Sequence, residues 1–398
     1  MTVAAARMPF PQPHPLHPPP LLRKLQARGP IHPIRTATGD PAWLVTDYEL
    51  ARQLLADDRM GRSHPDPERA SRTGHSVLFG GPSGVFDTEP ADHARMRALL
   101  RPHFSPRRMR ALRGRVETLT AGLLDDMAAA GPPADLHAAL ALPLPIAVIC
   151  ELLGVPYEDR AGFRAWTQAA ADVTDRARSE RGLAELFDYG RRLVARKRAQ
   201  GHVGDEEGAD VISRLAATDG VGDEEAARLG MLLLFAGHET TVAAIGLGAL
   251  ALLAHPDQWR MLTDDPSRVD AAVEELLRTP GLGGGGIPRY ARTDLDVGGV
   301  RVRTGDLVVM DLGAANHDPA AFPDPDRFDI TRPPSAHLTF GHGARYCLGA
   351  PLARIELQVV FTQLAVRFPT LRLACRPQEL TVTADVLVRG LTALPVTW

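Results

Sequence analysis

The stretch Phe340-Gly341-His342-Gly343-Ala344-Arg345-Tyr346-Cys347-Leu348-Gly349 carries most of the information in this 398-residue chain. Three glycines surround a single cysteine, and apolar spacing predicts an amphipathic helix directly after them, over residues 350–368. Glycine lets a backbone curl around a sulfur atom without a clash from Cβ. Backbone N–H groups and a helix N-terminus stabilise a thiolate. The pattern therefore suits a thiolate metal ligand at Cys347, and the alternative for a single cysteine is a buried residue in a Gly-rich turn.

The other two cysteines favour a plainer role. Cys150 lies in an apolar helical stretch and Cys375 in a predicted strand, so both are expected to be ordinary buried residues. Three cysteines cannot all pair in disulfides, which favours a reducing cytoplasm. Zinc at Cys347 is disfavoured because no second cysteine stands at a zinc-ligand spacing.

Composition and charge narrow the class of protein. The chain is 44% hydrophobic and 23% charged with a net charge of −3, which indicates a globular protein and argues against nucleic acid or an acidic membrane as partner. Residues 231–254 are apolar enough to suggest a membrane span, but His238 and Glu239 inside them favour a buried central helix. Residues 1–22 are Pro-rich and lack the pattern of a signal peptide.

The periodicity along the chain predicts a mainly α protein with minor β sheets. Residues 1–39 form a Pro-rich N-terminal arm that is part of the fold, and 40–398 are expected to make one intertwined domain. Residues 60–90, rich in Gly, Pro and Ser, predict a long irregular loop. Alternation over 294–310 and the pattern of 371–398 predict short strands. Helices are predicted over 93–130, 135–154, 158–200, 208–218, 223–255, 257–278 and 350–368.

These features together resemble the cytochrome P-450 family. Residues 340–349 match its haem-binding loop, Phe-Gly-x-Gly-x-(His/Arg)-x-Cys-x-Gly. Ala236-Gly237-His238-Glu239-Thr240-Thr241 resembles its oxygen-binding helix, Glu275-Leu276-Leu277-Arg278 its Glu-x-x-Arg helix, and residues 318–328 its meander. The resemblance covers residues 40–398. It implies the cytochrome P-450 fold and haem b, with Cys347 as axial ligand of the iron.

The resemblance also implies roles for the interrupted helix of residues 223–255. Ala236 and Gly237 are small enough for a flat ligand to approach, whereas an acid and an alcohol inside an apolar helix need a reason. It implies that Thr240 hydrogen-bonds the dioxygen bound at iron and that Glu239 relays protons. The alternative is a Thr240 hydroxyl bonded to the carbonyl four residues earlier and a Glu239 paired with an arginine.

Further residues are implied to surround the cofactor. Phe340 would contact the haem, and four cations would bind its propionates, which suit the planar guanidinium fork: His93, Arg97, Arg289 and Arg345. Glu275 and Arg278, three apart on one helix face, can pair. The resemblance implies that Arg327 joins them in a buried network behind the haem.

The expected activity is haem-dependent monooxygenation, meaning hydroxylation or epoxidation of a small to medium organic substrate, such as a secondary-metabolite intermediate, with O2 and two electrons. A peroxygenase or isomerase, or a non-catalytic haem sensor, stays as the alternative. No reductase segment is expected before the end at Trp398, so ferredoxin and ferredoxin reductase would supply electrons. A basic run could dock such an acidic partner or could be a solvated helix face: Arg101, Arg107, Arg108, Arg110, Arg113 and Arg115.

Substrate contacts are expected from residues 60–90, 164–190, 281–288, Leu233, Leu234 and Val386–Leu387. The run Gly281–Gly286 contains G-x-G-x-x-G, but it follows a predicted helix, whereas a dinucleotide site needs a strand before the glycines and a helix after them. A backbone with few side chains there suggests a roomier pocket.

Overall fold

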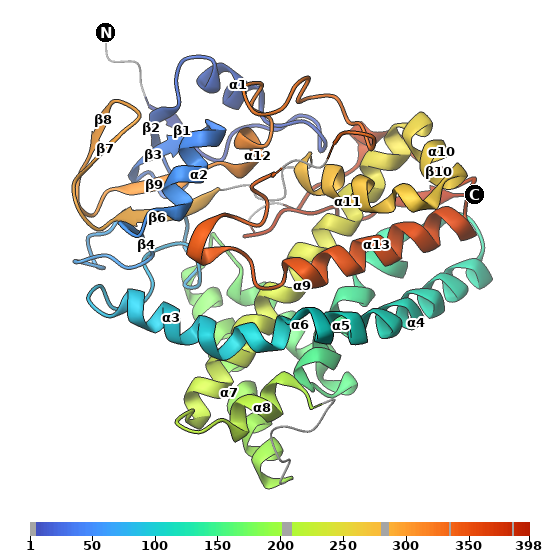
Figure 1. The fold of residues 1–398 in the computed structure, drawn as a ribbon, viewed down its shortest axis with the longest axis horizontal. Helices are drawn as coiled ribbons and strands as arrows, with labels where there is room; N and C mark the ends of the chain where they lie inside the picture. Colours follow the sequence, from blue (N-terminus) through green and yellow to red (C-terminus); the bar gives the residue numbers. More distant parts are fainter. Residues whose placement is uncertain (1–4, 201–208, 280–285, 334–335, 384–385) are drawn as a thin grey trace.

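The computed structural model describes residues 5–200, 209–279, 286–333, 336–383 and 386–398. Helices occupy most of the molecule and a sheet lies at one side (Figure 1). The helices are α1 (Pro20–Gln26), α2 (Tyr48–Ala56), α3 (Glu89–Leu100), α4 (Pro106–Ala130), α5 (Pro143–Leu153), α6 (Arg160–Ala170), α7 (Arg176–Ala199), α8 (Val211–Ala217), α9 (Asp223–Ala254), α10 (Pro256–Asp264), α11 (Val269–Arg278), α12 (Leu312–Ala315) and α13 (Ala350–Arg367). The strands are β1 (Ala6–Arg7), β2 (Ile31–Arg35), β3 (Pro41–Val45), β4 (Met60–Gly61), β5 (Ala134–Asp135), β6 (Ile287–Ala291), β7 (Leu295–Val297), β8 (Val300–Val302), β9 (Leu307–Met310), β10 (Arg372–Leu373) and β11 (Pro395–Thr397).

Helix α9 is the central helix of the core. It packs against α5, α7, α11 and α13, and apolar side chains surround it, as expected for a helix that is apolar on all faces. Its mean hydropathy of 1.4 would suit a membrane span, but 72% of the relevant window is buried inside the protein. The prediction of a buried central helix is therefore confirmed.

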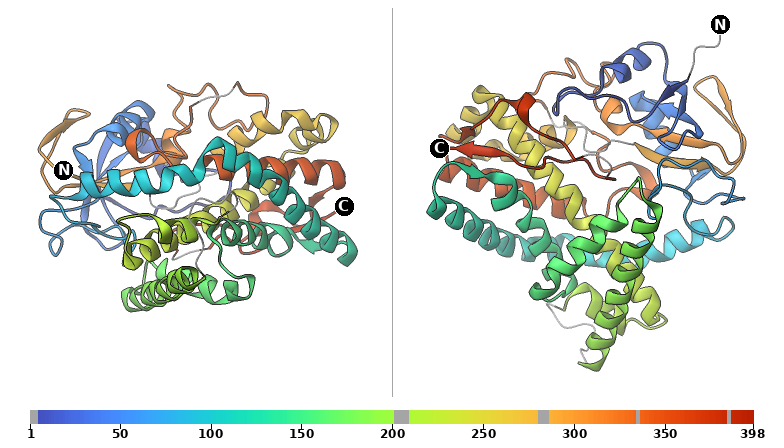
Figure 2. Two further views of the ribbon diagram at one scale, coloured as in Figure 1. Left: turned by 60° about the horizontal axis from the view of Figure 1, so that its bottom comes forward. Right: turned by 180° about the vertical axis from the view of Figure 1, so that it is seen from behind.

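The largest sheet joins the N-terminal arm to the middle of the chain. Its strand order is β1-β2-β3-β9-β6-β4, with β2 antiparallel to β3 and β3 parallel to β9. Met8, Phe10 and Leu22 of the arm are buried against this sheet and its neighbours. From behind, the blue arm runs near the red C-terminal segment (Figure 2), where Arg389 donates a hydrogen bond of 3.3 Å to Gln12.

Several predicted helices are divided where the chain cannot continue a helical hydrogen-bond ladder. The helix predicted over 93–130 begins earlier, at Glu89, and breaks before α4, because Pro102 and Pro106 lack an N–H and Ser105 is extended. The helix predicted over 158–200 breaks near Asp172, whose carboxylate accepts the N–H groups of Thr174 and Asp175. A π-helical turn, His137–Ala141, precedes α5. The helix predicted over 257–278 is divided between α10 and α11 by a 3-10 turn at Pro266–Arg268.

The two remaining cysteines differ in burial. Cys150 is buried in α5, where burial raises the pKa of its thiol to about 12. Cys375 lies just beyond β10 and is only half-buried, so its placement inside a buried strand was wrong. Strand β10 ends at Leu373: the N–H of Ala374 still bonds to Pro395 O, but Pro395 has no N–H to return a ladder bond.

Candidate active site

The Cys347 loop is a compact turn that leads directly into α13. Gly341 and Gly343 have φ of 74° and 70°, a region that favours glycine. A Cβ on Gly343 would lie 2.8 Å from Ala56 Cα, so α2 leaves no room for a side chain there. The Cys347 N–H donates to Phe340 O over 2.9 Å, which closes the loop. The glycines thus serve both loop conformation and its packing on α2.

The Cys347 thiol is surrounded by groups that stabilise negative charge. The residue is solvent-accessible, yet dense packing around the sulfur raises the pKa of the thiol. Backbone N–H groups of Gly349 and Ala350 oppose this rise, as do the charges of Arg97 and Arg354. A metal at the sulfur would complete the stabilisation, because a coordinating thiol is deprotonated. This donor set suits a single thiolate ligand to iron.

Helix α9 exposes two side chains in its otherwise buried middle, Ala236 and Thr240. They are four residues apart and so share one face. The Thr240 hydroxyl donates to Ala236 O over 3.1 Å, which is the back-bonded alternative weighed from the sequence. Gly237 faces elsewhere, because a Cβ there would lie 2.6 Å from Ile149 Cδ1 of α5. Its small size therefore serves helix packing, and a contact of Gly237 with the cofactor stays a prediction.

Glu239 pairs with its neighbour His238 rather than with an arginine. Oε1 of Glu239 lies 3.3 Å from Nε2 of the fully buried His238, whose Nδ1 lies 2.9 Å from Leu234 O. Burial raises the pKa of Glu239, but His238, Arg164 and His137 together hold it below its ordinary value. Nε of Arg164 and Nδ1 of His137 have no hydrogen-bond partner among the described residues, although both are buried. The sequence suggested an arginine as partner of Glu239, and no pattern along the chain marked the adjacent His238 instead.

Of the four predicted propionate-binding residues, Arg345, Arg289 and His93 lie around one buried acid, Glu89, and Arg97 lies beside His93. Arg345 hydrogen-bonds to Glu89, and Arg97 donates to Tyr346 O over 2.6 Å. Burial, then the charges of Arg345 and Arg97, lower the pKa of His93 to about 4. Arg289 is 9% exposed and has a pKa lowered to about 9, chiefly by burial.

Two further arginines, Arg62 and Arg292, belong to the same cluster. Arg292 lies 3.2 Å from Glu89. Arg62 repels Arg289, which lowers the pKa of Arg289 further. No sequence pattern marked either residue, since Arg62 falls in the irregular loop and Arg292 just beyond a strand. The described part of the cluster holds more positive charge than Glu89 balances, which is what two propionates require. The residues present therefore fit haem.

The Glu275–Arg278 pair is buried as expected, but its third member is Arg332. Glu275 and Arg278 make a two-point ion pair of 2.7 and 2.8 Å, with side chains 2% and 1% exposed. Arg332 Nε lies 3.3 Å from Glu275. Arg327 was the wrong choice, because its side chain is 67% exposed and pairs with Asp329. Only its backbone carbonyl meets the network, 3.4 Å from Arg278.

Phe340 is fixed by charged neighbours on the outer side of the loop. The guanidinium of Arg354 lies 4.6 Å from its ring centroid, and Glu274 clamps Arg354 through contacts of 2.6 and 3.0 Å. His337 also pairs with Glu274, at 3.1 Å. The ring is thus held in one orientation, and its contact with the cofactor stays a prediction.

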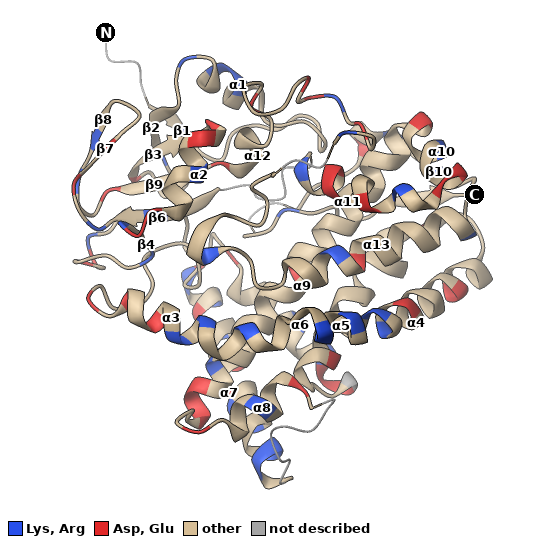
Figure 3. Ribbon diagram, in the orientation of Figure 1, with Lys and Arg blue, Asp and Glu red and all other residues tan. Residues whose placement is uncertain are grey.

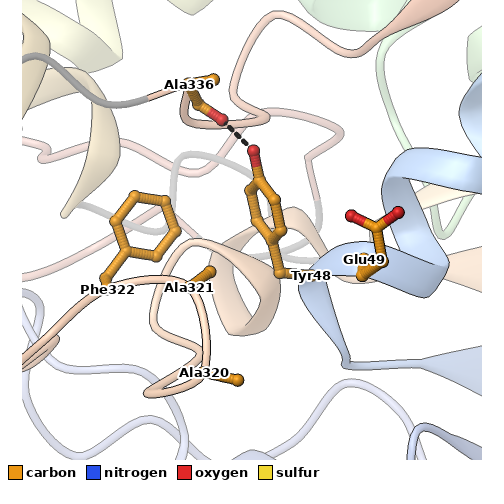
Figure 4. Close-up of a pocket in the computed structure, with 6 residues that line it drawn as sticks. All are labelled: Tyr48, Glu49, Ala320, Ala321, Phe322 and Ala336. Atoms are coloured by element: carbon orange, nitrogen blue, oxygen red, sulfur yellow. Dashed lines mark hydrogen bonds between the residues drawn. The ribbon is translucent and has the colours of Figure 1, made fainter.

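A surface pocket lies apart from these residues. It is lined by Tyr48 and Glu49 of α2, by Ala320, Ala321 and Phe322 of the meander, and by Ala336 (Figure 4). The Tyr48 hydroxyl donates to Ala336 O across it. It shares no residue with the cysteine loop or the exposed face of α9.

Among the predicted substrate contacts, Leu233 and Leu234 are buried in α9, and Val386 bridges to Asp172. Most of the 281–288 span, including Gly281–Gly285, lies outside the described residues, so the meaning of the glycine run stays a prediction.

Comparison of the chain with known proteins identifies its family. A family model described as "Cytochrome P450" matches residues 173–380. Pentalenolactone synthase of Streptomyces exfoliatus is 43% identical over 98% of this chain and 99% of the relative. Cytochrome P450 monooxygenase PikC of Streptomyces venezuelae is 42% identical over 95% and 90%. The solved structure of the pimaricin epoxidase PimD, substrate-free, superposes with a TM-score of 0.88 at 40% identity over the full length of both chains. The chain therefore belongs to the cytochrome P450 family.

Proposed function

We propose that this cytochrome P450 monooxygenase hydroxylates or epoxidises a small to medium organic substrate, a secondary-metabolite intermediate. The enzyme binds haem b and uses O2 and electrons supplied from outside the chain. Relatives whose names state such reactions support the substrate class, among them the mycinamicin IV hydroxylase/epoxidase of Micromonospora griseorubida, 39% identical over 94% of both chains. The observation that carries the proposal is the exposed pair Ala236 and Thr240 on α9, which packs against the helix that follows Cys347.

The predicted site residues would have separate roles around the cofactor. When bound, haem activates O2 for insertion of one oxygen atom, and a thiolate ligand favours O–O cleavage. Cys347 would hold the iron, and His93, Arg97, Arg289 and Arg345 would hold the propionates. Phe340 of the ligand loop would contact the cofactor, and Ala236 would leave room for the cofactor and substrate.

Thr240 and Glu239 would manage protons. The Thr240 hydroxyl bonds only to Ala236 O within the described structure, so rotation about χ1 can release it to donate toward the oxygen site. Glu239 beside it is held ionised by His238 and is 26% exposed, so its carboxylate can accept a proton and pass it on. The unpaired nitrogens of Arg164 and His137 suit water molecules leading to Glu239.

We also propose a ferredoxin with its reductase as electron source and the cytoplasm as location. Lys and Arg positions, blue on the ribbon, lie along α4 (Figure 3). The basic run is not one uniform face: Arg115 pairs with Glu151 of α5 and Arg108 donates to Ala209 O. Arg113 bonds to Gln358 of α13 and lies 3.7 Å from Glu117, whereas Arg110 is exposed and supports an acidic partner on the Cys347 side.

A binding screen tests the substrate class. Purified holoenzyme would be titrated with macrolide, terpenoid and peptide intermediates while the haem spin state is followed by absorption. We expect at least one class to convert low-spin to high-spin haem and, with ferredoxin, reductase and NAD(P)H, to give a product containing one atom from 18O2. Turnover with hydrogen peroxide but never with the electron-transfer chain would favour the peroxygenase instead.

A further inference from the structure

We propose that Arg62 is a further haem-binding residue, whose guanidinium receives a propionate together with Arg289 and Arg345 and ties the cofactor to the loop around Phe79. The inference rests on the propionate site proposed above and adds a residue that no sequence pattern identified.

Strand pairing brings Arg62 next to Arg289. Strand β4 ends at Gly61, which pairs with Tyr290 of β6, so Arg62 follows directly beside the β6 strand. Arg62 Nη1 donates to Pro288 O over 3.4 Å, and Arg289 Nη1 donates to the same oxygen over 2.9 Å. Two guanidinium groups therefore meet at one backbone carbonyl.

The positive charges of Arg62, Arg289 and Arg345 require a nearby anion. Burial lowers the pKa of Arg62, and Arg345 lowers it further. Burial, then Arg62, lowers the pKa of Arg289. The carboxylate of Glu89 already serves Arg345, Arg292 and the backbone N–H of Arg62. Confined like charges destabilise a protein unless a counter-charge joins them, and guanidinium forks match carboxylates in geometry. Two propionates supply this counter-charge.

Arg62 also touches the loop that covers α9. Its Nη2 donates to Gly81 O over 3.3 Å, and its guanidinium lies 5.7 Å from the Phe79 ring centroid. Phe79 in turn stacks on Phe235 of α9, with centroids 5.7 Å apart and planes at 25°. A propionate that holds Arg62 in place would therefore also hold the loop around Phe79 against α9.

The test is haem transfer from holoenzyme to excess apomyoglobin, for wild type and Arg62→Gln, loaded either with haem or with haem dimethyl ester. With haem, we expect Arg62→Gln to lose cofactor about tenfold faster, because one charge-assisted pair is gone. With the diester, whose propionates carry no charge, the two proteins should differ by less than about twofold. Arg62→Lys should fall between wild type and Arg62→Gln with haem.

The control is Arg59→Gln, which removes the same charge from the same segment. Arg59 is exposed and pairs with Asp57, so its variant should lose haem at the wild-type rate. Equal acceleration with haem and diester, or none with haem, would overturn the role of Arg62. The thiolate Soret band of the reduced carbonyl complex, recorded before transfer, separates this failure from failure of Cys347 ligation. Hydrogen exchange of residues 76–83 should also rise in Arg62→Gln holoenzyme.

Discussion

Glu356 of α13 is a buried acid with no role in the proposed chemistry. Its replacement by glutamine should stabilise the enzyme relative to the wild type, by an amount that grows as pH rises. The side chain is 1% exposed, and its Oε2 has no hydrogen-bond partner in the described part of the chain. Helices α4, α9, α10 and α11 pack around α13. Burial alone raises the pKa of Glu356 from 4.5 to about 8, with no charged neighbour contributing.

The magnitude follows from proton linkage. A carboxyl whose pKa is raised in the folded state contributes its full stabilisation only below its unfolded-state pKa. This stabilisation is lost as pH rises from the unfolded-state pKa through the folded-state pKa. Between these values the unfolded chain is ionised while the folded protein stays protonated, so each pH unit costs about 1.4 kcal/mol. From about pH 5 to about pH 7, the wild type should therefore lose about 3 kcal/mol that Glu356→Gln does not lose.

The assay is urea unfolding of holoenzyme followed by far-UV circular dichroism at pH 5, 6 and 7. The free energy of unfolding of Glu356→Gln minus that of the wild type should grow with pH, and titration of every other group cancels in this difference. Glu117→Gln, on the exposed surface of α4 with a side chain 49% exposed, is the matched control and should give a flat difference. A flat or falling difference for Glu356→Gln would refute the reasoning from burial.

Three further substitutions test the site and its scaffold. Cys347→Ala should abolish the thiolate Soret band of the reduced carbonyl complex, and a retained band would disprove ligation by this sulfur. Thr240→Ala should keep haem but divert electrons from product to hydrogen peroxide, measured as peroxide formed per NAD(P)H, whereas Thr241→Ala should stay coupled; equal coupling in both contradicts the proton role. Arg332→Ala should lower the free energy of unfolding by about 2 kcal/mol, because a hydrogen-bonded charge leaves buried Glu275. Arg327→Ala should change it by less than about 0.5 kcal/mol, and the reverse order would contradict the placement of Arg332.

The sequence by itself determined the features that depend on local spacing. Glycines around Cys347, the apolar run of α9 and the three-residue spacing of Glu275 and Arg278 each leave a pattern along the chain, because one turn or one helix brings those residues together. Family resemblance and the mainly helical class followed from such patterns. Helix boundaries were less well predicted, since prolines such as Pro106 divide a helix while apolar periodicity runs on through the break.

Only the tertiary structure decided which distant residues meet. Arg62 joins Arg289 through pairing of β4 with β6. Arg332 rather than Arg327 reaches Glu275, although Arg327 lies in the meander and Arg332 just beyond it. Gly237 is small because Ile149 of another helix occupies its space. Long-range contacts of this kind depend on strand register and helix packing. An arginine side chain is long and flexible, so no pattern along the sequence indicates which residue its guanidinium will contact.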